Sequence, residues 1–217
     1  MTSVFDRRQI LAGGGFVATA LVGLVASRRA ARATDRAPDP AVSAIQAFYD
    51  VLLGTMKQAD VLGVEGRYEK LKAIVEATFD FPAMTQAAVG STWSSIPEDT
   101  RTALITAFTR MTTATYAHNF DGYDGERFDV DPRARPRKEF LVVHSALVRP
   151  KQEPIEFDYL MHPVAGLTWK AVDIYYSGTV SQLAQRRSEF SAVLRARGPD
   201  GLVQRLNELG DQLLKGS

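Results

Sequence analysis

Histidine and carboxylate side chains are the groups of this chain best suited to bind a metal or move a proton. The three histidines, His118, His144 and His162, are far apart in sequence, and none has another histidine or a carboxylate at metal-ligand spacing. The segment 121–126 contains three carboxylates and two glycines but lacks the alternating aspartates of a calcium loop. We therefore interpret it as a solvated turn and expect neither a metal nor another cofactor.

Two aspartates, Asp158 and Asp173, stand inside predicted strands, where aspartate is disfavoured. A buried carboxylate in a deep pocket can serve as a general base. The simpler interpretation is that each points outward or pairs with a nearby cation, namely Arg186, Arg187 or Lys170. No nucleophile, base and orienting group can be assigned around them. We expect a protein that is not an enzyme; an enzyme acting on a hydrophobic substrate, with Asp173 or Asp158 as base, is the alternative.

The first 33 residues have the layout of an export signal and take no part in the fold prediction. Two arginines, Arg7 and Arg8, precede an apolar, glycine-rich run over 10–26, and residues 31–33 read Ala-Arg-Ala, a small-x-small cleavage site. This order favours the twin-arginine route. The run is short for a membrane span. We predict cleavage and a periplasmic location, with a retained inner-membrane anchor as the alternative.

Composition limits what the exported chain does. Cleavage after Ala33 leaves 184 residues with 21 basic and 24 acidic side chains, a net charge of −3 (21 − 24). That balance gives no support for nucleic-acid binding, which needs a basic face. The chain has no cysteine, which excludes disulfides, thiolate metal sites and a cysteine nucleophile. We predict one domain, residues 34–217, held together by its apolar core.

Start and stop signals place the helices. Asp39-Pro40 and Asp80 before Pro82 each combine an N-cap with a proline in the first turn. Ser95 and Glu98 have the spacing of a capping box, and Gly198 before Pro199 ends a helix. With apolar residues at three- and four-residue spacing, these signals predict helices over 40–60, 67–78, 81–89, 97–119, 180–197 and 200–215.

From residue 127 the apolar period changes from helical to alternating. Four segments rich in β-branched and aromatic residues, separated by short breaks, predict an antiparallel meander; they cover 127–131, 139–148, 155–161 and 167–177. One face carries Leu141, Val143 and Leu147 or the alternate set, and the pattern does not decide which faces inward. Helices, then a sheet, then helices indicate an α+β domain with the sheet covered on one face.

Aromatic and methionine residues follow the helical stripes, and ordinary core packing explains them. Large flat or flexible side chains also suit a pocket for apolar chains. The residues concerned are Phe79, Phe81, Met84, Trp93, Phe108, Met111, Tyr116, Phe120 and Tyr123. Periodicity alone favours core.

Two longer motifs identify a family. The first covers 79–84, 89–90 and Trp93; the second covers 169–173, 178–181 and 186–190. In these motifs and over about 41–214 the chain resembles the MlaC-like, toluene-tolerance family of periplasmic lipid-binding proteins. Segments 66–69, 120–128 and 186–194 are similar to one branch, the hopanoid-biosynthesis-associated protein HpnM.

The resemblance implies a curved four-stranded antiparallel sheet wrapped by about six to seven helices around one apolar pocket. It also implies a carrier that shuttles phospholipid or a hopanoid between an inner-membrane ABC lipid transporter complex and an outer-membrane lipoprotein or porin complex. A membrane-associated scaffold of hopanoid biosynthesis is the alternative. Twelve residues are predicted to line the pocket or the core beside it: Phe81, Met84, Val89, Trp93, Phe108, Met111, Val143, Phe157, Tyr159, Trp169, Val172 and Ile174.

Overall fold

The computed structural model describes residues 39–165 and 168–215, and the predicted export signal, residues 1–33, lies outside them. The first described helix, α1 (Pro40–Met56), begins as its sequence predicts: the Asp39 carboxylate accepts a hydrogen bond from the Ala41 amide at 3.0 Å, and Pro40 stands in the first turn. Its buried side chains, Ile45, Phe48 and Leu52 among them, recur at three- and four-residue spacing.

Helix α2 (Ala59–Thr78) starts earlier than predicted. Gly63 leaves the helical conformation with φ 60°, which only glycine adopts without strain, so the chain turns there and resumes as a helix. Gly66 lies inside the helix, although it stands before residue 67, where the helix was predicted to begin. Arg67, buried on this helix, donates to the carbonyl oxygens of Ala117 at 2.7 Å and Ala59 at 3.0 Å. Burial lowers the pKa of this guanidinium.

The next two helices differ in how their starts match the sequence. Asp80 caps α3 (Phe81–Val89) through a 3.0 Å bond from the Ala83 amide, as predicted. The capping box predicted for the following helix is wrong. A 3-10 turn, η1 (Gly90–Ser95), precedes α4 (Glu98–Asn119), and within it the Ser95 hydroxyl donates to the Thr92 carbonyl at 2.8 Å. The Ser95 side chain is therefore not used as a cap.

The antiparallel meander of four strands is confirmed, with two short strands added. The order is β1-β3-β4-β5-β6, and β2 pairs with β3 beside β1. The bounds are β1 (Arg127–Val130), β2 (Arg135–Arg137), β3 (Phe140–Val148), β4 (Ile155–Val164), β5 (Thr168–Tyr176) and β6 (Val180–Ser181). The predicted last strand and the following helix are separated by β6, which takes the place of the helix's first turn.

Cross-strand register decides which side chains share a face. Val143 pairs with Tyr159, and Tyr159 pairs with Ile174, so these three side chains point to the same side, and all are buried. We call this side the inner face. Between Leu160 and Met161 the register shifts, and Val172 becomes the extra residue of a β-bulge. The opposite, outer face is half-buried along β3.

The C-terminal helix α5 (Gln182–Leu214) is broken where predicted: Gly198, with φ 68° and ψ −174°, and Pro199 divide it into two straight parts. The second part lies against α4, where Arg110 pairs with Asp211 at 2.6 Å. In the described residues, five α-helices and one 3-10 helix accompany the sheet, which is the expected α+β class. No described helix is long and apolar enough to cross a membrane.

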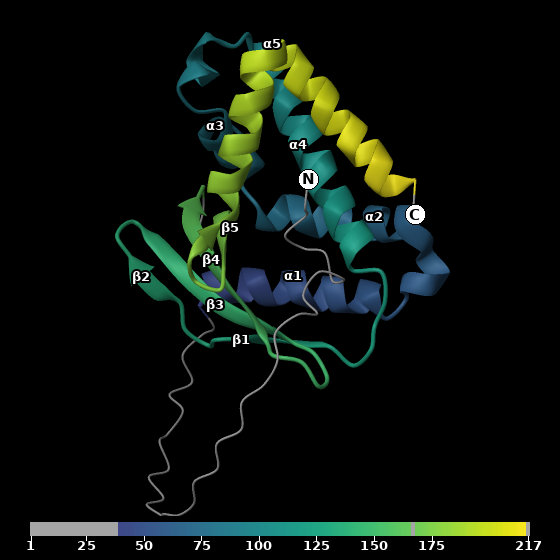
Figure 1. Ribbon diagram of the computed structural model, residues 1–217. Coiled ribbons are helices and arrows are strands. Elements are labelled where there is room, and N and C mark those ends of the chain that lie inside the picture. Colours follow the sequence, from purple (N-terminus) through teal and green to yellow (C-terminus); the bar gives the residue numbers. More distant parts are fainter. Residues whose placement is uncertain (1–38, 166–167, 216–217) are drawn as a thin grey trace, which may run out of the picture. The chain divides into compact units, whose positions relative to one another are not determined.

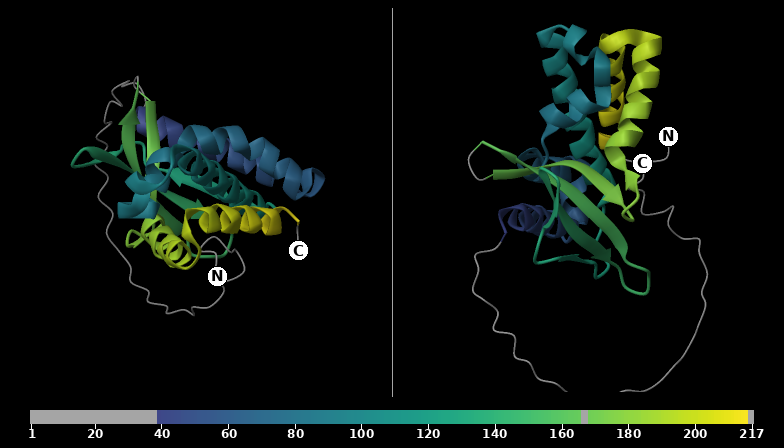
Figure 2. Two further views of the ribbon diagram at one scale, coloured as in Figure 1. Left: turned by 90° about the horizontal axis from the view of Figure 1, so that it is seen from above. Right: turned by 90° about the vertical axis from the view of Figure 1, so that its left-hand side faces the viewer.

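Figures 1 and 2 show how these elements are arranged. α1 lies along the sheet with α2 packed against it, and α3, α4 and α5 pack together. α4 also packs against α2, and the centroid of its Tyr116 ring lies 5.3 Å from that of Phe48 of α1. The apolar core is therefore continuous, with one part between α1 and the inner face of the sheet and another among α3, α4 and α5.

Candidate functional site

The two parts of the core meet at Phe79, in the short extended segment between α2 and α3. A parallel bridge to β5 fixes this segment, since the Asp80 amide donates to the Ala171 carbonyl at 2.9 Å. The Phe79 ring lies with its centroid 6.4 Å from that of Tyr159 on the sheet and 6.0 Å from that of Phe81 on α3. It thus connects the sheet to the helical group through aromatic contact.

From Phe81 the aromatic contacts continue through the helices. Phe81 meets Phe108 edge-to-face at 5.8 Å between centroids, and Phe108 meets Phe190 edge-to-face at 5.3 Å. All three rings are buried, and they come from α3, α4 and α5. On the sheet, Phe157 and Tyr176 form a similar pair at 5.9 Å. The interior between sheet and helices is therefore built from aromatic side chains that contact one another.

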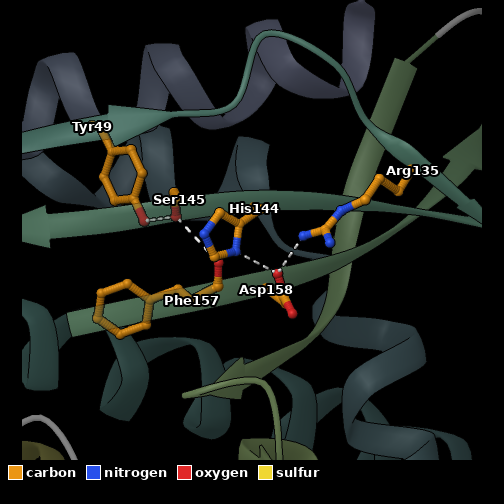
Figure 3. Close-up of polar contacts among 6 residues, drawn as sticks. All are labelled: Tyr49, Arg135, His144, Ser145, Phe157 and Asp158. Carbon is orange, nitrogen blue, oxygen red and sulfur yellow. Dashed lines mark hydrogen bonds and ion pairs between the residues drawn. The ribbon is translucent and has the colours of Figure 1, made fainter. Parts of the chain in front are cut away.

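A small polar network stands within this interior on the inner face (Figure 3). The Tyr49 hydroxyl of α1 lies 2.8 Å from the Ser145 hydroxyl and donates to the Tyr159 hydroxyl at 2.9 Å. Burial raises the pKa of Tyr49 and Tyr159 above the usual range, and it does the same for Tyr116 nearby. These hydroxyls are therefore uncharged at every physiological pH, and they bring hydrogen bonding into the interior without adding charge.

Asp173, one of the two candidate bases, has a structural position. Its carboxylate accepts from the Ser181 hydroxyl at 2.6 Å, from the Leu183 amide at 3.0 Å and from the amide of Ile174 at 2.8 Å. It is 5% exposed and lies at the start of α5. The expectation that it points outward or pairs with a cation is wrong, because it joins β5 to the first turn of α5.

Asp158 lies on the outer face and pairs with side chains that the sequence did not indicate. It is the cross-strand neighbour of His144, whose Nδ1 stands 2.8 Å from its carboxylate, and Arg135 of β2 approaches the same oxygen at 3.3 Å (Figure 3). Of the cations proposed as its partners, Arg186 instead pairs with Glu189 at 2.8 Å, and Lys170 donates to the Glu76 carbonyl at 2.9 Å.

His162 forms a second, separate pair with a carboxylate. Its Nε2 lies 2.7 Å from Asp80, whose other oxygen caps α3. This contact ties the end of β4 to the start of α3. No group of three or more potential ligands that could hold a metal ion occurs in the part of the chain that the structure describes.

The structure buries nine of the twelve residues predicted to line the pocket. These are Phe81, Met84, Val89, Phe108, Met111, Val143, Phe157, Tyr159 and Ile174. Trp93 on η1 and Trp169 and Val172 on β5 are half-buried. The nine form a helical set and a sheet set, and Phe79 connects the two.

Several residues of this interior are absent from that prediction. Tyr49 and Phe190 each lie within regular apolar spacing on a helix, where they are indistinguishable from any other core residue. Phe79 opens the first family motif, and its position there was the available signal. Their contribution depends on contacts between distant segments, which the local pattern does not contain.

Comparison with known proteins assigns the class. The family model described as MlaC protein matches residues 46–208, and the chain belongs to this family. No curated protein matches.

A solved structure gives a closer geometric comparison. The chain is similar to the phospholipid-binding protein from Ralstonia solanacearum, which was solved in complex with a phospholipid. The two are 25% identical, the match covers 80% of this chain and 98% of that chain, and the TM-score is 0.68. The chain thus has the same α+β fold as that protein.

Proposed function

We propose that this protein is a periplasmic lipid-binding carrier that holds its cargo between the inner face of the sheet and helices α3, α4 and α5. The observation that carries the proposal is the connected aromatic interior, from Tyr159 through Phe79 and Phe81 to Phe108 and Phe190, in a chain of the MlaC family. The similar Ralstonia protein, which holds a phospholipid, supports the same assignment.

The chemistry of the interior suits an apolar guest. Its polar groups on the inner face are uncharged hydroxyls that already bond to one another. Each methylene removed from water contributes about 0.8 kcal/mol, so one long acyl chain gains on the order of 10 kcal/mol before the costs of binding. Neither a cofactor nor a nucleotide is needed for that affinity. Because such a ligand leaves slowly, release requires a partner that opens the interior.

The finer parts of the proposal come from the family resemblance. The cargo is a phospholipid or a hopanoid, and the protein moves it between an inner-membrane ABC lipid transporter and an outer-membrane lipoprotein or porin complex. The resemblance to HpnM is the reason to include a hopanoid as the alternative cargo. Three cations, Arg186, Arg187 and Lys170, are candidates for the lipid head group by charge alone. Arg186 and Lys170 are engaged within the protein, whereas the Arg187 guanidinium lies across Gly90 at the α3–η1 junction.

Native mass spectrometry tests the proposal. The protein is purified without detergent from the periplasm of a hopanoid-producing cell, and the lipids released from it are identified. We expect one lipid-bound species and a protein mass beginning at Thr34. Stoichiometric phospholipid supports a phospholipid carrier, and a hopanoid supports the specialised branch. An empty protein that also takes up no lipid from vesicles contradicts the carrier function.

A further inference from the structure

A short basic segment at the edge of the sheet stands apart from the proposed lipid interior. Residues 133–138 contain four cations, Arg133, Arg135, Arg137 and Lys138, and all four are exposed. We call these four residues the basic hairpin, because β2 runs through them and turns into β3. They stand on an exported chain whose net charge is −3 (21 − 24), so the positive charge is local.

The fold gives these cations a common direction. Arg135 pairs in register with Val142 and Arg137 with Phe140, positions that alternate with Val143, so both arginines share the outer face. Figures 1 and 2 show the β2–β3 turn extending beyond the helices at the sheet edge. Lys138 occupies that turn with φ 56°.

Contacts within the protein leave most of this charge available. Arg135 lies 3.3 Å from Asp158, but its side chain is 61% exposed, and His144 shares the same carboxylate. Arg137 lies over the ring of Tyr175 with 5.1 Å between the guanidinium and the ring centroid. Exposed pairs of this kind are weak. The exposed Glu139 beside Lys138 reduces the positive charge of the turn by one, and the basic hairpin still presents an excess of positive charge to a partner.

We propose that the basic hairpin docks the protein on the anionic phospholipid headgroups of a bilayer. Clustered Lys and Arg are attracted to anionic lipid surfaces, and a flat aromatic ring beside a cation, as in Arg137 and Tyr175, suits the boundary between headgroup and water. The inner face lies on the other side of the sheet, so docking leaves the lipid interior uncovered. The inference rests on the proposed function in one respect: a lipid carrier has to contact a membrane. The positive charge of the basic hairpin and the outer face on which it lies do not depend on that function.

Vesicle co-sedimentation tests the docking. The periplasmic protein is mixed with vesicles of phosphatidylcholine, with or without phosphatidylglycerol, at low and high salt. We expect binding only when phosphatidylglycerol is present, and weaker binding at high salt. The variant Arg133→Gln/Lys138→Gln, which spares Arg135 and Arg137 and their contacts, should bind at least about tenfold more weakly.

A matched variant separates the basic hairpin from net charge. Lys72→Gln/Arg195→Gln removes the same charge from exposed positions on α2 and α5 and should bind like the wild type. Equal weakening by both variants, or no binding of the wild type to phosphatidylglycerol vesicles, overturns the proposal and points to an acidic protein surface as the partner instead. All variants should keep their bound lipid in native mass spectrometry; a wild-type protein without lipid counts against the carrier function and not against the docking.

Discussion

The two faces of the sheet differ in burial and in charge, although the same strands form both. On the inner face, Val143, Tyr159 and Ile174 are buried, and its hydroxyls bond only within the protein. On the outer face, His144, Asp158 and Arg135 form a half-exposed charged cluster. Along β3 and β4, strand alternation separates a buried face without charged side chains from a half-exposed, charged face one residue away. The lipid site and the membrane-docking face that we propose therefore lie on opposite sides of the sheet.

Substitutions at Val142 and Val143 test the difference between the two faces of the sheet most directly. Val143→Trp adds a large ring to the buried inner face, where we expect a loss of about 1–3 kcal/mol in the free energy of unfolding and a marked fall in bound lipid. Val142→Trp adds the same ring to the half-buried outer face and should change stability by no more than about 0.5 kcal/mol. Denaturant unfolding and native mass spectrometry measure both. Equal lipid content in the two folded variants would show that the inner face does not contact the cargo.

Tyr49→Phe tests how much a buried hydroxyl of the inner face contributes to stability. Loss of the Tyr49 hydroxyl removes its bonds to Ser145 and Tyr159 and should cost about 0.5–1.5 kcal/mol at neutral pH. Burial raises the pKa of Tyr49 in the folded protein, so above about pH 10 the unfolded chain loses this proton and the folded one keeps it. The stabilisation from the neutral tyrosine is complete below that pH and decreases above it. Each such tyrosine steepens the alkaline loss of stability by about 1.4 kcal/mol per pH unit.

The unfolding free energy of Tyr49→Phe should therefore fall less steeply with pH than that of the wild type. Ser145→Ala is the matched control, because it removes a bond of the same network without removing an ionisable group. Its slope should stay close to that of the wild type. Equal slopes for all three proteins would mean that Tyr49 ionises as readily folded as unfolded.

Asp158→Asn is expected to have the smallest effect. It removes the negative charge between His144 and Arg135 but keeps the side-chain shape, and half-exposed pairs of this kind contribute about 0–1 kcal/mol. Bound lipid should not change, because Asp158 faces away from the interior. Thermal unfolding and native mass spectrometry check both points. A large loss of lipid would place the cargo on the outer face of the sheet instead of the inner face.

Local chemistry made much of the fold predictable. Asp39 and Asp80 cap helices because the cap and the capped amide are within three residues of each other. Gly198 followed by Pro199 breaks α5 for an equally local reason. The capping box at Ser95 failed because a nearby competitor, the Thr92 carbonyl, takes the hydroxyl within a 3-10 turn. Short-range signals are reliable only where no other short-range partner is available.

Contacts set by register were not predictable. Phe140 to Val143 are four consecutive apolar residues, so alternation could not show which face is inner. His144 meets Asp158 because β3 and β4 pair in one particular register, and a shift of one residue would place them on opposite faces. Asp173 stood out as a charged residue within a strand, but its partners lie in β6 and α5, beyond the turn that follows. The interior depends in the same way on Phe79, which contacts elements distant in the sequence.

The break at Gly198 divides α5 into two helical parts that meet at a single residue. The first part, Gln182 to Arg197, is bonded to β5 through Asp173. The second part is bonded to α4 through the ion pair between Arg110 and Asp211. Sixteen helical residues span about 24 Å at 1.5 Å per residue. A rotation of ten degrees at Gly198 would move the far end of the first part by about 4 Å. That end is held to β5 by the bond from the Leu183 amide to Asp173, so β5 would have to follow or this bond would have to break.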